Sequence, residues 1–264
     1  MLPLVLSNLR QHKYSMETLK NIHEKTSVLI FLGFLGCIAV TFFPAIPQDI
    51  AYHNFADQRT LLNIPNFWNV ISNVPFMIIG IYGVFHCIKL VKPDWSFVTF
   101  FLGIFLTGLG SSYYHWHPDN QTLVWDRLPM TIAFMSFFSI IIREYITGRP
   151  LNFLLALLLT IGIFSVFYWE HTEILGHGDL RLYILIQFLP MILIPIMMLT
   201  FRPKPGETIY LWLMLLCYAV AKLSETFDHE IFCVVLSGHT LKHVFAALAP
   251  FIFLLRIHKV KAQV

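Results

Sequence analysis

The sequence predicts an all-α integral membrane protein with eight transmembrane helices: a seven-helix core preceded by one extra helix. Of its 264 residues, 57% are hydrophobic and only 12% are charged, whereas a soluble domain is typically about 25% charged. The hydrophobic residues gather in eight runs, each close to the roughly 20 residues with which a helix crosses a bilayer. A surface this poor in charge must face lipid over most of its area.

Each hydrophobic run predicts one helix. We expect the helices at residues 27–46, 67–89, 95–115, 125–143, 151–170, 182–201, 208–227 and 237–257. The first run lacks a small-residue cleavage site, so it predicts a retained helix rather than a signal peptide. Prolines inside later runs are tolerated because neighbouring helices can satisfy the freed backbone groups. These prolines are Pro75, Pro129, Pro190, Pro195 and Pro250.

The connections between the runs are short, which predicts a single helical domain. Residues 67–257 would form the seven-helix core, residues 27–46 the extra helix, and residues 1–26 a cytoplasmic N-terminal segment. This first segment has weak helical periodicity, so it either lies on the membrane surface or forms a polar tail.

Lysine and arginine residues set the expected orientation. With the N-terminus in the cytoplasm, 13 of the 18 basic residues fall on the cytoplasmic side. Such an excess inside is typical of membrane proteins, so both termini are expected in the cytoplasm, in agreement with the even number of helices. The compact loops and the lack of a sorting signal favour a bacterial inner membrane, with an internal eukaryotic membrane as the alternative.

The composition also excludes several classes of protein. The formal charge is +3 and no basic run is interleaved with aromatic residues, so nucleic-acid binding is not expected. Three of the four cysteines lie inside hydrophobic runs and none forms a CxxC pair, which favours apolar thiols over disulfides or a cysteine metal site. No pair of broken helices and no inverted repeat indicates a transporter.

The expected topology brings five polar residues to one depth near the outer face of the membrane. The run 95–115 travels outward and ends near His115, and the run 125–143 travels inward from near Asp126. The run 237–257 also travels inward and opens with the segment SGHTLKH. The residues that meet are therefore Ser111, His115, Asp126, His239 and His243.

These residue types predict a catalytic zinc site. His239 and His243 are spaced i, i+4, so their imidazoles share one helix face and can hold one metal ion. His115 would supply a third nitrogen and leave one tetrahedral position for water, the arrangement of catalytic rather than structural zinc. Ser111, at i−4 from His115, could hydrogen-bond the developing oxyanion, and Asp126 could shuttle the proton.

Taken singly, these residues also have structural interpretations. Asp126 could be the N-cap of the fourth run, and Ser111 could be a small residue at a helix–helix contact. Ionisable groups inside a membrane are expensive, however, and they usually serve function. The combination at one depth therefore favours the metal site.

Four segments resemble the alkaline ceramidase family, which belongs to a superfamily of membrane hydrolases and adiponectin-type receptors. They occur in the family's order and span most of the chain from the second run onward. The segments are FWNVISN (67–73), GSSYYH (110–115), WDRLPM (125–130) and HTLKH (239–243). The serine, the aspartate and the three histidines are shared across the superfamily, whereas the FWN-x-x-SN and D-x-LPM contexts favour the ceramidase branch.

The resemblance implies a zinc-dependent amidase that cleaves ceramide, or a related N-acyl membrane lipid, into a sphingoid base and a fatty acid. By position it makes His115, His239 and His243 the zinc ligands, and Ser111 and Asp126 the hydroxyl and acid–base residues. The alternative is a seven-helix lipid receptor in which zinc is structural. The resemblance leaves the oligomeric state open.

The sequence departs from the family's pattern at two places. Eukaryotic members bind calcium through acidic residues before the FWN segment, but Asn66 stands immediately before it here, so no calcium site is expected. Lys242 lies between the two histidines, where it would either snorkel toward the headgroups or bind an anionic lipid head as a substrate contact. Lys222, Glu225 and Asp228 are expected to form a second polar set, most simply a structural ion-pair network.

Overall fold

The computed structural model describes residues 2–89, 93–201, 208–232 and 236–261, and its described part is built from helices. Eight of these helices are long and apolar enough to cross a membrane, which confirms the predicted all-α integral membrane fold. The elements in order are α1 (Leu2–Thr41), the 3-10 helix η1 (Ile50–His53), α2 (Phe67–Ile71), α3 (Val74–Ile88), α4 (Trp95–Trp116), α5 (Asn120–Ile142), the π-helical turn η2 (Arg143–Thr147), α6 (Asn152–Ile174), α7 (Arg181–Thr200), α8 (Thr208–Thr226), α9 (Asp228–Ile231) and α10 (Gly238–Lys261).

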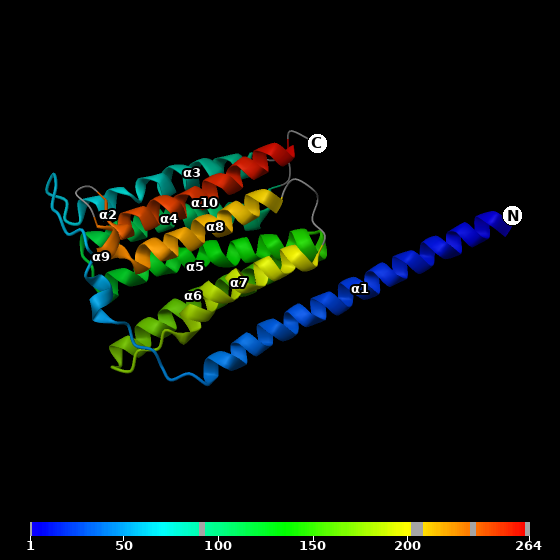
Figure 1. The fold of residues 1–264 in the computed structure, drawn as a ribbon, viewed down its shortest axis with the longest axis horizontal. Helices are drawn as coiled ribbons and strands as arrows, with labels where there is room; N and C mark the ends of the chain where they lie inside the picture. The colour runs from blue at the N-terminus through cyan, green and yellow to red at the C-terminus, as the bar shows by residue number, and fades with distance from the viewer. Residues whose placement is uncertain (1, 90–92, 202–207, 233–235, 262–264) are drawn as a thin grey trace.

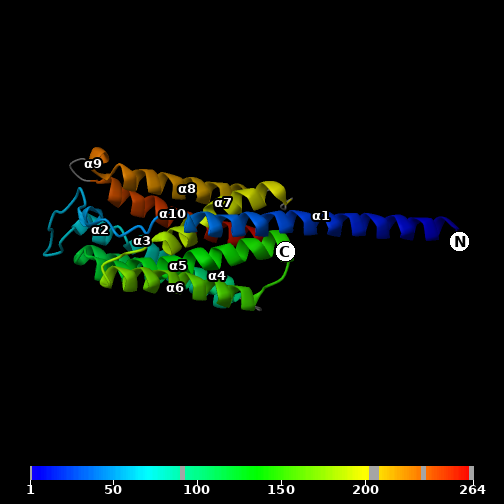
Figure 2. The ribbon, with the colours of Figure 1, turned by 90° about the horizontal axis from the view of Figure 1, so that it is seen from below.

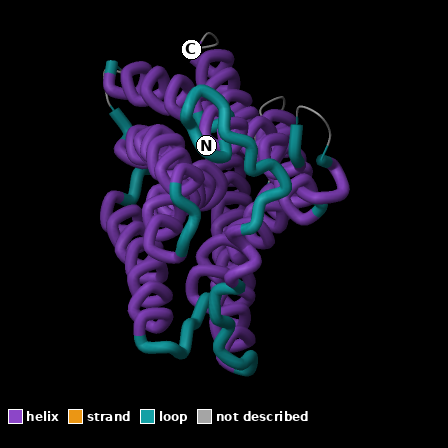
Figure 3. Tube along the Cα trace, turned by 90° about the vertical axis from the view of Figure 1, so that its left-hand side faces the viewer, coloured by secondary structure: helices purple, strands orange, loops and turns teal. Residues whose placement is uncertain are grey.

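The long helices lie side by side as one bundle (Figures 1 and 2). η1, α2 and α9 gather at one end of the bundle, and the first residues of α1 and the last residues of α10 lie toward the other. Figure 3 looks along the bundle from the end that carries the short helices, where loops join the long ones. The two chain ends thus lie on one side, as the even helix count predicts, while the orientation in a membrane stays a prediction.

The bundle interior is filled largely by aromatic and branched side chains. Phe101 and Phe253 are fully buried, and the ring of Phe253 stacks parallel to that of Phe97 at 5.6 Å between centroids. The ring of Phe137 meets Phe253 edge to face at 5.4 Å. Packing of this kind between helices stabilises a membrane bundle by dispersion, because lipid tails remove most of the hydrophobic drive for association.

α1 differs from the extra helix predicted at 27–46. Its backbone is helical without interruption from Leu2 to Thr41, so the boundary expected at residue 26 falls inside one helix, and its spanning part is Ile22–Thr41. The helix ends five residues earlier than expected, because Pro44 disfavours helical backbone in the residue before it. α1 packs against α7 and leaves most of its spanning part facing outward, and it continues beyond the other helices (Figure 2).

Two other predicted runs begin or break at unexpected residues. The run 67–89 divides into α2 and α3 at Ser72 and Asn73, and Pro75 enters the first turn of α3, where a missing N–H does no harm. α5 starts at Asn120, because Asp119 caps it by accepting a hydrogen bond from the Thr122 amide at 2.7 Å. The interpretation of Asp126 as the N-cap is therefore wrong: it lies in the second turn of α5.

Some residues covered by the sequence-based expectations lie outside the described ranges, and the exposure of one cysteine differs from the expectation. Lys92, Arg202 and Lys204, expected on the cytoplasmic side, and Cys233 lie outside the described ranges. Cys87 is a buried thiol as predicted, but Cys37 is exposed on the outward-facing surface of α1.

Candidate active site

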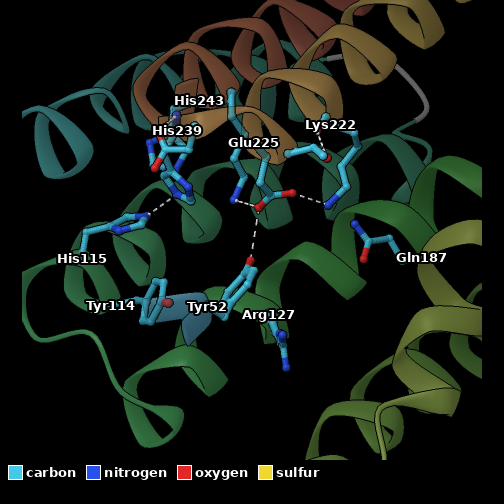
Figure 4. A network of polar contacts seen from close by, with 12 residues as sticks. Tyr52, Tyr114, His115, Arg127, Gln187, Lys222, Glu225, His239 and His243 are labelled. Atoms are coloured by element: carbon cyan, nitrogen blue, oxygen red, sulfur yellow. Dashed lines mark hydrogen bonds and ion pairs between the residues drawn. The ribbon is translucent and has the colours of Figure 1, made fainter. Parts of the chain in front are cut away.

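Three histidines converge where the end of α4 meets the start of α10 (Figure 4). The Nε2 atoms of His115 and His239 are 3.2 Å apart, and one ring nitrogen from each of His115, His239 and His243 lies within 4.8 Å of the others. All three side chains are buried, with exposed fractions of 0%, 3% and 3%. The structure therefore brings together the three ligand candidates that the sequence predicts.

The first turn of α10 is fixed by a close helix contact and a carboxylate. A Cβ atom at Gly238 would lie 2.2 Å from the Ser224 carbonyl oxygen, so only glycine lets α10 start there. The Asp228 carboxylate accepts a 2.6 Å hydrogen bond from the backbone N–H of His239 and a 2.9 Å bond from Ala56. Asp228 thus accepts from an amide in the first turn of α10. It does not join Lys222 and Glu225, contrary to the polar set expected from the sequence.

The chemistry of the histidine set fits a divalent metal ion. The Ser72 hydroxyl lies 2.7 Å from Nδ1 of His243, which leaves Nε2 as the nitrogen of that ring available to an ion. Nδ1 of His115 is buried and has no hydrogen-bond partner among the described residues. Three buried imidazoles without a carboxylate partner are expensive to keep unless their nitrogens bind something, and zinc is a common partner of such a set.

Ser111 and Asp126 face each other across α4 and α5. The two helices touch just beside them, because a Cβ atom at Gly110 would lie only 1.8 Å from the carbonyl oxygen of Trp125. Both residues are buried and, with His243, they line one cavity.

The cavity has a volume of about 250 Å³ and two chemically distinct parts. One part is apolar, and its wall includes Phe76, Phe100, Ile104, Phe134, Met191 and Pro250. The other part is polar and lies beside the histidines; its wall includes Tyr52, Asp126, Arg127, Lys222, Glu225 and Lys242. A cavity with one polar and one apolar part suits an amphiphilic ligand.

Glu225 joins the polar residues of the cavity into one network (Figure 4). Its carboxylate pairs with Lys242 at 2.5 Å and with Lys222, and it accepts a hydrogen bond from the Tyr52 hydroxyl at 3.2 Å. The expected snorkelling of Lys242 does not occur, because its side chain is only 13% exposed and is held inward by Glu225. The ion pair between Lys222 and Glu225 agrees with the predicted polar set.

Arg127 is a site residue that no pattern in the sequence singles out, although it follows Asp126 directly. Its side chain is buried, and its Nη2 donates to the Gln48 side-chain oxygen at 2.6 Å. The guanidinium carbon lies 4.3 Å from the Trp169 ring centroid and 4.8 Å from that of Tyr183. Only its position beside Asp126 in the WDRLPM segment could have drawn attention to it.

The segment between α1 and α2 covers the histidines, and this role was also missed. The Phe55 ring packs against His115 and His239, with centroids 4.7 and 4.6 Å away. Both nitrogens of His53 are engaged, one by the Tyr114 hydroxyl at 2.8 Å and the other by the Asn120 side chain at 2.9 Å. The segment carries no motif, so its position over the site could not be read from the sequence.

Asp57 and Asn66, which precede α2, both form hydrogen bonds within the protein. Asp57 is held by Arg59, whose Nη2 and Nε lie 2.6 and 2.8 Å from its carboxylate oxygens. Burial raises the pKa of Asp57, but the hydrogen bonds from Arg59 outweigh it, so the net direction is down. Asn66 donates to the His115 carbonyl oxygen at 2.9 Å, which ties this segment to the histidine site instead.

Comparison with known proteins adds one match. A family model described as Ceramidase matches residues 60–263, about three-quarters of the chain. The match takes in α2 to α10 with all three histidines, and it leaves out α1 and the segment that carries Tyr52 and Phe55. No curated protein matches the chain.

Proposed function

Because the chain belongs to the ceramidase family, it is a hydrolase of a lipid amide bond, and we propose that it is a zinc-dependent intramembrane amidase. Its substrate would be ceramide or a related N-acyl lipid, cleaved to an amine base and a fatty acid. The observation that carries the proposal is the meeting of three buried histidines with Ser111 and Asp126 beside a two-part cavity.

His115, His239 and His243 would hold the zinc ion, and Ser72 would orient His243 through its Nδ1. A zinc ion bound there supplies Lewis-acid chemistry: it lowers the pKa of bound water toward about 7 and polarises the amide carbonyl. The buried setting strengthens every charge interaction at the site, because little water screens it.

Asp126 is the proton carrier of the proposed reaction. Its carboxylate takes a proton from the attacking water as the new C–O bond forms, and it returns that proton to the amide nitrogen as the C–N bond breaks. The Ser111 hydroxyl lines the same cavity as Asp126 and can donate a hydrogen bond to the oxyanion. Water is consumed, and one acid and one amine are released.

The acyl chain would occupy the apolar part of the cavity and enter sideways from the bilayer, with residues 67–257 as the catalytic core and α1 as an added helix. The positive-inside pattern supports cytoplasmic termini and an active site toward the outer face of a bacterial inner membrane. The chain ends and the histidine site lie at opposite ends of the bundle, as this orientation requires.

The test is to purify the protein, measure bound metal, and follow fatty-acid release from ceramide. His239→Ala should lose zinc and activity together, whereas Asp126→Asn should keep zinc and lose turnover by roughly 10²–10⁴-fold. His117→Ala is the matched control, because His117 is exposed two residues beyond His115 and should change neither quantity. Full activity in His239→Ala would refute the ligand assignment, and zinc-loaded protein that hydrolyses no N-acyl lipid would refute the enzyme.

A further inference from the structure

We propose that Tyr52, Lys222, Glu225 and Lys242 form a headgroup subsite that selects N-acyl lipids whose amine half carries an oxyanion. The group would be a carboxylate, a sulfonate or a phosphate monoester, placed next to the amide bond that is cleaved. The inference rests on the proposed function and narrows its substrate class.

The four residues are placed to contact the amine half of a substrate. They line the same cavity as Ser111, Asp126 and His243, and they come from three separate parts of the chain: η1, α8 and α10. Lys242 directly precedes His243, and Figure 4 shows Glu225 between Lys222 and Tyr52 beside the histidines. The apolar part of the cavity is left for the acyl chain.

The charged groups of the cavity wall do not balance. The wall contains three cations, Arg127, Lys222 and Lys242, and only two anions, Asp126 and Glu225. Glu225 pairs with both Lys222 and Lys242, so one carboxylate faces two ammonium groups in the subsite. The cavity therefore carries one positive charge that no side chain compensates.

An uncompensated charge inside a membrane protein is expensive, and a ligand can remove that cost. Neutral ceramide offers hydroxyl groups and leaves the surplus charge in place. A lipid with one oxyanion near its amide neutralises it. Because the cavity is walled largely by apolar side chains, the attraction is weakly screened and discriminates strongly between the two headgroups.

The hydrogen-bond donors of the network point to the same ligand chemistry. One oxygen of Glu225 accepts from Tyr52 and Lys242, and the other accepts from Lys222, so the only carboxylate of the network is already engaged. An ammonium group carries three donors and no acceptor. Each lysine therefore has donors beyond its bond to Glu225, and a ligand that satisfies them must bring acceptor oxygens.

The experiment compares kcat/KM for four lipids with the same palmitoyl chain: N-palmitoylsphingosine, N-palmitoylserine, N-palmitoyltaurine and the 1-phosphate of N-palmitoylsphingosine. At least one anionic lipid should exceed the neutral one by about tenfold or more, as a charge-assisted hydrogen bond predicts. The three anionic lipids separate carboxylate, sulfonate and phosphate recognition.

Variants then test which residues recognise the negative charge of the lipid headgroup. Lys242→Gln should abolish the preference for the anionic lipid, and Lys242→Arg should retain it. Lys222→Gln should reduce the preference while leaving the Lys242–Glu225 pair intact, so it serves even where Lys242→Gln fails to fold. Lys89→Gln is the charge-matched control, because Lys89 is exposed at the far end of α3.

Two outcomes would overturn the subsite. One is a wild-type protein that cleaves the neutral lipid as fast as the anionic ones. The other is a Lys242→Gln variant whose activity falls equally on all four lipids, since that is the behaviour of a purely structural ion pair. Failure to hydrolyse any of the four lipids would instead refute the proposed amidase, which keeps the two failures apart.

Discussion

Ser72 shows how a single hydroxyl can set the state of a metal ligand. It contacts Nδ1 of His243 at 2.7 Å and so determines which ring nitrogen can face an ion. His115 has no equivalent, because its Nδ1 has no hydrogen-bond partner among the described residues. The orientation of His243 therefore depends on one side chain from α2's C-terminal cap.

We expect Ser72→Ala to weaken zinc binding by roughly 10–100-fold, the usual cost of losing a hydrogen bond behind a metal-ligating histidine. Metal titration of the purified protein measures the effect. Ser112→Ala is the control, because the Ser112 hydroxyl bonds the carbonyls of Gly108 and Val70 and, among the described residues, no histidine side chain. Equal affinities for Ser72→Ala and Ser112→Ala would show that Ser72 does not orient the ligand.

At the scale of elements, the contact between α4 and α5 sets the geometry of the acid–base pair. Gly110 of α4 lies against the Trp125 carbonyl oxygen of α5. Ser111 is the next residue on α4, and Asp126 is the next residue on α5. Helices in membranes approach this closely only where one of them offers a small residue. Asp126 comes into position because Asp119 starts α5 nearly two turns earlier.

Gly110→Ala should push α4 and α5 apart, because its Cβ cannot lie 1.8 Å from the Trp125 oxygen. We expect an overpacking cost of about 1–3 kcal/mol, seen as a lower melting temperature, and a loss of lipid hydrolysis that exceeds the loss of folded protein. Gly33→Ala is the control, since its Cβ would meet only Leu193 at an ordinary 3.8 Å. Normal activity in folded Gly110→Ala protein would contradict this account.

At the scale of the whole molecule, the site is closed by a segment outside the region that matches the family. Residues 42–59 carry Phe55 over two histidines and Tyr52 onto Glu225, and the Ala56 amide reaches Asp228. Ile46 also accepts a hydrogen bond from the Leu180 amide at 2.8 Å, which ties the same segment to the start of α7. Residues 42–59, which follow the extra helix α1, therefore form a cover over the active site.

Phe55→Ala should open this cover. We expect zinc to be lost to a chelator several-fold faster than from the wild type, because water and chelator would then reach the histidines from that end of the bundle. The rate of zinc extraction is the measurement. Phe43→Ala removes an aromatic ring that is 61% exposed in the same segment, so it should not change that rate. An unchanged rate in Phe55→Ala would show that the segment does not shield the metal.

The membrane helices and the convergence of the three histidines could be predicted from the amino-acid sequence alone, because both rest on local patterns. A run of about 20 apolar residues can satisfy its backbone in lipid only as a helix, and the i, i+4 spacing puts His239 and His243 on one face whatever surrounds them. With the direction of each run known, His115, Ser111 and Asp126 had to fall at a similar depth.

The surroundings of the histidine site could not be predicted in this way, because they depend on how the chain folds. That Lys242 turns inward depends on Glu225 arriving from α8, and that Phe55 covers the histidines depends on the path of a loop without a motif. Asp228 bonds the first turn of α10 because the start of α9 lies against the start of α10. These roles arise from contacts between residues far apart in the chain, and such contacts leave no periodic or local signal in the sequence.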